Sequence, residues 1–126
     1  MSSSQRTILV VEDNSLNEEL ICSCLDSLGY GFAVSHDGKE AVEACKRRSF
    51  DLILMDCQMP NMDGFEATTQ IRLIEGANGA ARTPIVALTA STVDGDRERC
   101  FGFGMDDYLS KPFRVSDLRK KLDSWL

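Results

Sequence analysis

Five short apolar runs, each followed by a polar or helically periodic segment, constrain most strongly what this chain can fold into. The runs are continuous in Val, Ile and Leu rather than alternating, which is typical of strands buried on both faces. Strands of this kind that alternate with helices predict a parallel sheet with helices on both of its faces. We expect the strands at 7–11, 32–35, 51–55, 84–88 and 107–110.

The segments between these runs carry signals for helix starts and ends. Asp37 and Asp63 stand where N-cap residues are expected, and Gly29 follows the first helical repeat, where it would end the helix. We expect a loop at 75–84. The expected helices span about 16–28, a stretch within 36–48, 64 to about 75, 91 to about 103, and 115–125.

Length and charge exclude several classes of protein. The 126 residues predict one domain, in which 1–6 are expected to be disordered and 7–126 to form the domain. Twenty acidic and fourteen basic residues give a net charge of −6, which argues against a nucleic-acid-binding surface. The sequence has no apolar run of about eighteen residues and no signal peptide, so we expect a cytoplasmic domain without membrane contact.

Five cysteines and a single histidine give no metal or disulfide pattern. Their spacing includes no C-x-x-C pair, and His36 has no partner at ligand spacing. We therefore expect free thiols in a reducing compartment, with Cys57 serving in packing, and a surface position for His36.

Chemically active residues gather at the ends of the expected strands. Glu12 and Asp13 follow the first strand, Asp56 follows the third, Thr89 follows the fourth, and Lys111 comes just after the fifth. A parallel sheet carries all of these ends to one edge, where ligands bind in such folds. Two like charges about 4 Å apart repel by several kcal/mol at an effective dielectric near 20, so the acids need cations beside them.

Lys111 supplies one positive charge, and a hard divalent cation such as magnesium would supply the remainder. A carboxylate beside a lysine, a metal and the Thr89 hydroxyl forms a pocket for a phosphoryl group. Asp56 can then act as the nucleophile and become an aspartyl phosphate. Each residue also has a simpler interpretation, as a surface lysine, a strand threonine or acids at a helix start. Their joint presence favours the site.

The segments "LVVEDN", "DLILMDCQMPNMDG", "ALTAS" and "YLSKPF" occur in an order and at a spacing that resemble the receiver domain of two-component response regulators. The resemblance covers the chain from about Thr7 to Leu126. It implies an α/β flavodoxin-like fold, a three-layer α/β/α sandwich with five parallel strands in the order 2-1-3-4-5 and five helices. It also implies that Asp56 receives a phosphoryl group from a phosphohistidine on a histidine kinase or a histidine phosphotransfer domain.

The resemblance further implies a magnesium site, with manganese as a substitute. Asp13 and Asp56 would bind the metal directly, Glu12 through water, and Gln58 through its main-chain carbonyl. Thr89 and Lys111 would hold the phosphoryl oxygens.

Other implied features concern the switch. Tyr108 would be the aromatic that turns inward when Thr89 moves toward the phosphoryl group. Lys111 and Pro112 would be joined by a cis peptide, and Gln58 and Ser91 would tune the lifetime of the phosphoryl group. A dimer through the fourth helix, fifth strand and fifth helix is a further expectation.

The "VEDN" and "MDCQMPNMDG" segments and the long loop at 75–84 most resemble receiver domains of hybrid sensor histidine kinases. The domain itself would be a self-phosphorylating switch rather than a turnover enzyme. Its parent chain would then be a kinase, and a membrane-bound sensor kinase is one form that this parent could take. A stand-alone single-domain regulator is the alternative origin.

Three other classes of function fit less well. A dehalogenase-like phosphatase needs a second aspartate two residues after the first, where this chain has Gln58. A flavin or nucleotide binder needs a phosphate cradle after the first strand, where this chain is acidic. A pseudo-receiver that serves only as an interaction module would not require the acceptor, the metal acids, the threonine and the lysine together.

Overall fold

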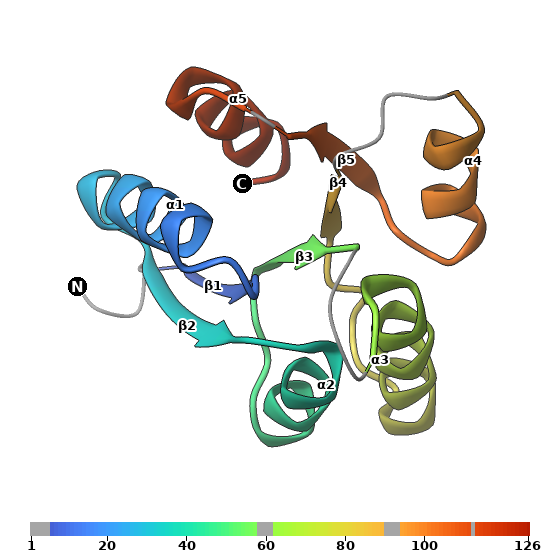
Figure 1. Cartoon of the computed structure of the whole chain (residues 1–126). Helices are drawn as coiled ribbons and strands as arrows, with labels where there is room; N and C mark the ends of the chain where they lie inside the picture. Colours follow the sequence, from blue (N-terminus) through green and yellow to red (C-terminus); the bar gives the residue numbers. More distant parts are fainter. Residues whose placement is uncertain (1–5, 58–61, 90–93, 112) are drawn as a thin grey trace.

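The computed structural model describes residues 6–57, 62–89, 94–111 and 113–126. Its five strands are all parallel and form one sheet in the order β2-β1-β3-β4-β5, with helices on both faces (Figure 1). This confirms the predicted flavodoxin-like fold. The strands are β1 Thr7–Val11, β2 Gly31–Ser35, β3 Leu52–Asp56, β4 Ile85–Thr89 and β5 Asp107–Ser110, and the helices are α1 Ser15–Ser27, α2 Gly38–Arg47, α3 Gly64–Asn78, α4 Asp94–Gly102 and α5 Val115–Trp125.

Two apolar layers hold the helices to the sheet. Helices α1 and α5 cover one face, where Ile21, Leu25, Leu118 and Leu122 pack against side chains of the strands. Helices α2, α3 and α4 contribute to the layer on the other face. All residues of β3 and β4 are buried, because both strands lie in the middle of the sheet and are covered on both sides.

The predicted caps are confirmed. The Asp37 carboxylate accepts a hydrogen bond from the Glu40 N–H at 2.8 Å, and the Asp63 carboxylate accepts one from the Glu66 N–H at 2.9 Å. Gly29 follows α1 with a φ of 83°, a left-handed conformation that glycine adopts without strain.

Several expected boundaries were wrong by one to three residues. Strands β3 and β4 continue through Asp56 and Thr89, because the ladder pairs these residues with Leu88 and Ser110. Helix α3 runs on to Asn78 instead of ending near Glu75, so the expected loop at 75–84 is shorter. The helix tolerates Gly76 in its last turns and ends where Gly79 takes a left-handed φ of 64°.

Further expectations concern the cysteines, His36 and membrane contact. All five cysteines are free, as predicted. The His36 side chain is exposed, and its Nε2 lies 2.8 Å from the Glu18 carboxylate. In the part of the chain that the structure describes, no helix combines the length and the apolar character that crossing a bilayer requires.

The edge of the sheet at which the strands begin is held by one half-buried arginine. The guanidinium of Arg72, on α3, donates two hydrogen bonds to the Gly104 carbonyl, at 2.9 and 2.8 Å, and one to the Thr83 carbonyl, at 2.7 Å. It also forms ion pairs with Glu75 and Asp106, at 2.9 and 2.7 Å. Arg72 therefore joins α3 to the segments that lead into β4 and β5.

We predict that Arg72→Met lowers the free energy of unfolding by about 3 kcal/mol, because it removes the cation of the largely buried Glu75 carboxylate and leaves Asp106 with only the exposed Arg82. Urea unfolding measures the loss. The control is Arg119→Met, at an exposed position on α5, which should change stability by no more than about 0.5 kcal/mol. Equal effects of the two substitutions would contradict the assignment.

Candidate functional site

The carboxyl edge of the sheet brings the predicted residues together. Glu12 and Asp13 come directly after β1, and Asp56 is the last residue of the adjacent strand β3. Asp56 is paired with Leu88, so Thr89 stands one residue further along β4. The Lys111 N–H donates a hydrogen bond to the Thr89 carbonyl at 2.7 Å. In Figure 1, α1 begins just after the end of β1.

Lys111 lies between two buried carboxylates. Its Nζ is 3.0 Å from Oε1 of Glu12 and 3.2 Å from Oδ1 of Asp56. The Glu12 side chain is fully buried and that of Asp56 is 4% exposed. Burial would lower the pKa of Lys111, but its hydrogen bonds to Glu12 and the charges of both acids raise that pKa above its ordinary value. The lysine therefore stays charged in this site.

Glu12 is only partly satisfied by the residues that the structure describes. Its Oε2 accepts hydrogen bonds from the Lys111 ammonium and from the Asn14 N–H, both at 3.3 Å. Its Oε1 is buried and close to the same ammonium, but no hydrogen bond of good geometry reaches it. Buried carboxylate oxygens normally have such a partner, so Glu12 suits a further ligand such as water on a metal ion.

Asp13 completes an acidic cluster at the mouth of the site. Glu12, Asp13 and Asp56 each offer a carboxylate oxygen, and these oxygens lie within 4.8 Å of one another. Reduced hydration, followed by a hydrogen bond to Asp56 and the charge of that carboxylate, raises the pKa of Asp13 above its ordinary value. A divalent cation with oxygen ligands would relieve this crowding, so the residues present fit magnesium.

Two glycines that the sequence analysis did not single out shape the loop beside Asp56. A Cβ atom on Gly64 would lie 2.3 Å from the Asp56 carbonyl oxygen, and one on Gly38 would lie 2.4 Å from the Met62 carbonyl oxygen. Neither distance is possible for a side chain, so both positions require glycine. The Asp-Gly pairs at 37–38 and 63–64, a common turn signal, were the available clue.

The remaining predicted site residues are placed as follows. Tyr108, in β5, is half-buried and packs against the core layer that includes Ala87, its partner in β4. Thr89 is buried, with 7% of its surface exposed. Gln58, Ser91 and Pro112, including the expected cis peptide, lie outside the residues that the structure describes.

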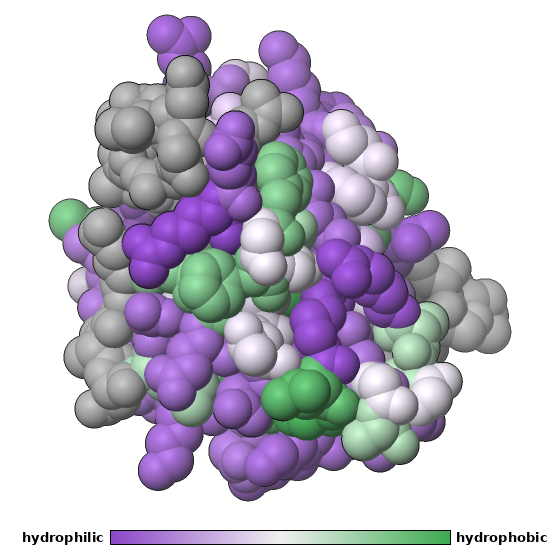
Figure 2. All heavy atoms as spheres, turned by 90° about the vertical axis from the view of Figure 1, so that its right-hand side faces the viewer, coloured by the Kyte–Doolittle hydropathy of each residue, from purple (hydrophilic) through white to green (hydrophobic). Residues whose placement is uncertain are grey.

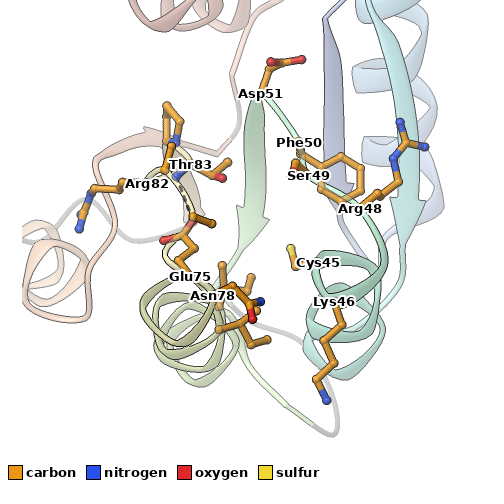
Figure 3. Close-up of a pocket in the computed structure, with 15 residues that line it drawn as sticks. Cys45, Lys46, Arg48, Ser49, Phe50, Asp51, Glu75, Asn78, Arg82 and Thr83 are labelled. Carbon is orange, nitrogen blue, oxygen red and sulfur yellow. Dashed lines mark hydrogen bonds between the residues drawn. The ribbon is translucent and has the colours of Figure 1, made fainter.

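A cavity of about 450 Å³ lies elsewhere, near the edge at which β3 and β4 begin. Figure 3 shows Cys45 on the α2 side, Glu75 and Asn78 on α3, and Thr83 before β4 around it. The Thr83 N–H donates a hydrogen bond to the Glu75 carboxylate at 2.9 Å, which contributes to the structure of this edge. None of the predicted site residues lines this cavity.

The sequence matches the family described as response regulator receiver domain over residues 8–123. Hybrid signal transduction histidine kinase B of Dictyostelium discoideum is 49% identical over 119 residues, which cover 88% of this chain and 6% of that protein. The chain thus spans a small part of the length of this curated relative.

Solved structures give the same assignment. The receiver domain of the sensor histidine kinase PA1611 from Pseudomonas aeruginosa PAO1, with a magnesium ion coordinated in its active site cleft, is 45% identical with a TM-score of 0.86; the match covers 97% of this chain and 98% of that one. A co-crystal structure from Saccharomyces cerevisiae contains the histidine phosphotransfer protein Ypd1 and the receiver domain of Ssk1. The match to it is 37% identical with a TM-score of 0.92, over 96% of this chain and 88% of that one.

The fold, the acidic edge with its lysine, and these similarities agree. This chain belongs to the response regulator receiver domain family of two-component phosphorelay signalling.

Proposed function

We propose that Asp56 is the phospho-acceptor of this domain and that its phosphorylation changes the surface of the domain. The observation that carries the proposal is the buried Asp56 carboxylate at the end of β3, with the Lys111 ammonium at 3.2 Å and the Asp13 carboxylate beside it. The donor would be a phosphohistidine on a histidine kinase or on a histidine phosphotransfer protein, the class to which Ypd1 belongs.

The transfer would be a single displacement at phosphorus. An oxygen of Asp56 forms a bond to phosphorus while the bond from phosphorus to the histidine nitrogen breaks. The electron pair of the broken bond stays on the bonded nitrogen. The imidazole leaves as the neutral ring when its other nitrogen keeps its proton, or when the bonded nitrogen gains one from solvent. No further reactant is needed.

Lys111 and Thr89 would stabilise the charge on the transferred group. The Lys111 ammonium already contacts Glu12 and Asp56, so it can contact phosphoryl oxygens without a large movement of the main chain. Thr89 stands at the end of the neighbouring strand and would donate its hydroxyl proton in a hydrogen bond.

Asp13 and Asp56, with Glu12 acting through water, would hold magnesium, and the Gln58 carbonyl would be a further ligand. When bound, the metal supplies positive charge that screens the carboxylates and the phosphoryl oxygens from one another. The acidic cluster of this chain and the magnesium-bound receiver domain from Pseudomonas aeruginosa support this proposal.

We expect a small phosphodonor with magnesium to add one phosphoryl group to the chain, in a linkage that base hydrolyses. Mass spectrometry should place the group on Asp56, and Asp56→Asn should abolish it. The matched control is Asp51→Asn, at the residue directly before β3. This variant should be labelled normally. Labelling of Asp56→Asn at the normal rate would refute the proposed acceptor.

We expect magnesium to raise the melting temperature of the wild type, because it relieves repulsion among the three carboxylates. Asp13→Asn should lose most of this gain and should melt no lower than the wild type when magnesium is removed by a chelator. Asp26→Asn, an exposed acid on α1, is the control. A full magnesium response in Asp13→Asn would contradict the metal assignment.

The partner that donates the phosphoryl group would contact α1 beside the site. Leu16 is 75% exposed and Leu20 is 39% exposed. They stand four residues apart, so they lie on one face of α1, the helix that begins two residues after Asp13. An apolar face next to the acceptor suits a protein donor, whereas a small donor would not need it.

Leu16→Gln should therefore slow phosphoryl transfer from a phosphohistidine protein about tenfold, as expected when one leucine loses its burial in an interface. The rate with a small phosphodonor should stay unchanged, which separates docking from chemistry. Leu73→Gln, at a 62% exposed leucine on α3, is the matched control. If both substitutions slow the protein reaction equally, α1 is not the docking surface.

The surface that changes would include α4, β5 and α5, with Thr89 and Tyr108 as the switch residues. Figure 2 views the side on which α4 lies and shows small apolar areas among hydrophilic ones. Phe101 and Phe103, each 41% exposed, are the large apolar residues that α4 and its end expose. A dimer through α4, β5 and α5 and a role of Gln58 and Ser91 in phosphoryl lifetime remain part of the proposal.

The similarity to hybrid histidine kinases supports an origin within such a kinase. We propose that the domain acts in the cytoplasm. A stand-alone regulator is the alternative. The sequence of the full-length gene product would decide between them.

A further inference from the structure

A cluster of side chains on β5 and α5 is centred on Asp107, which lies next to Tyr108 in the chain. Asp107 opens β5, and its Oδ1 accepts hydrogen bonds from the Lys121 ammonium and from the Tyr108 N–H, both at 2.8 Å. Its Oδ2 accepts a hydrogen bond from the Trp125 indole N–H at 3.0 Å. Lys121 and Trp125 are four residues apart, so both reach Asp107 from the same face of α5.

This arrangement fixes Lys121 above the ring. The Lys121 Nζ lies 5.7 Å from the centroid of the Tyr108 ring, within the range of a cation–π interaction. The Asp107 side chain is 20% exposed. Its burial would raise its pKa, but the hydrogen bonds from Lys121 and Trp125 hold the pKa of Asp107 below its ordinary value. The carboxylate therefore stays ionised and keeps the ammonium in place.

We propose that Lys121 is a positioning residue for Tyr108: its ammonium, held by Asp107, stabilises the ring position of this structure and opposes the movement that phosphorylation favours. The inference rests on the proposed function, in which the ring follows Thr89. The register supports the connection, because Tyr108 pairs with Ala87 and Thr89 lies two residues further, on the same face of β4.

The effect on the switch follows from linkage. A contact made in only one of two conformations shifts their ratio by the strength of that contact. When the contact is removed, the other conformation becomes more populated. A ligand that binds this other conformation then gains affinity, at most by the factor by which the ratio changed. A cation–π contact at a partly exposed site corresponds to a factor of about two to five.

The test measures the affinity of the intact chain for beryllofluoride with magnesium, a stable mimic of the phosphoryl group, by NMR titration of the amide signals near Asp56. Lys121→Met keeps the length of the side chain and removes its charge, and it should bind about twofold to fivefold more tightly than the wild type. Lys120→Met, at the exposed neighbouring position, should bind like the wild type.

A role of Lys121 only in packing α5 on β5 would not depend on the ring. The titration is therefore repeated in a Tyr108→Ala background, where adding Lys121→Met should leave the affinity unchanged. Equal affinities of Lys121→Met and Lys120→Met, or the same gain with and without the ring, would overturn the inference while the proposed function stands. If Asp56→Asn binds beryllofluoride as the wild type does, the proposed function fails, and the inference fails with it.

Discussion

The structure depends on burying two carboxylates at one edge of the sheet with a lysine between them. An ionised acid without a partner would cost several kcal/mol in such a place, so Glu12 and Asp56 require the ammonium of Lys111. These three residues follow or end strands β1, β3 and β5, and β4 lies between β3 and β5. Lys111 must therefore reach past the end of β4, where Thr89 stands one residue beyond the partner of Asp56. The strand order therefore determines which side chains meet at the site.

Much of this arrangement could be predicted because its signals lie in short segments of the sequence. Continuous apolar runs identify central strands, aspartates at 37 and 63 mark helix starts, and polar residues after each strand must meet when all strands are parallel. The pairing of Lys111 with Glu12 was not predicted, because it depends on how far a flexible side chain reaches. Arg72 was also missed: it binds main-chain carbonyls, which have no sequence signature, and Gly104 is 32 residues away.

The end of α3 was misjudged for a related reason. Gly76 resembles a helix breaker, yet one glycine destabilises a helix by only about 1 kcal/mol, and packing on the sheet offsets that. The candidate site also departs from a local rule, because acidic residues there lie close together. Asp13 has a raised pKa because reduced hydration and then the neighbouring Asp56 carboxylate disfavour its charge, a local conflict that a fold would ordinarily avoid and that a metal would relieve. At the acidic cluster, the departure from a local rule is informative about function. At the end of α3, it reflects only tertiary packing.

The two edges of the sheet have different roles: one anchors β5, and the other carries the candidate site. At the edge where the strands begin, Arg72 holds Gly104 and Asp106, which lead into β5, to α3. The hydrogen bonds are short and the side chains largely buried, so this end of β5 is anchored. At the other end, Lys111 contacts the two carboxylates that are proposed to serve the phosphoryl group and the metal, and Tyr108 lies between the two ends. In the proposed switch, a displacement of Lys111 would be taken up along a strand of only four residues. Because the beginning of β5 is anchored, we expect that displacement to reach Tyr108 and the elements that flank it, α4 and α5.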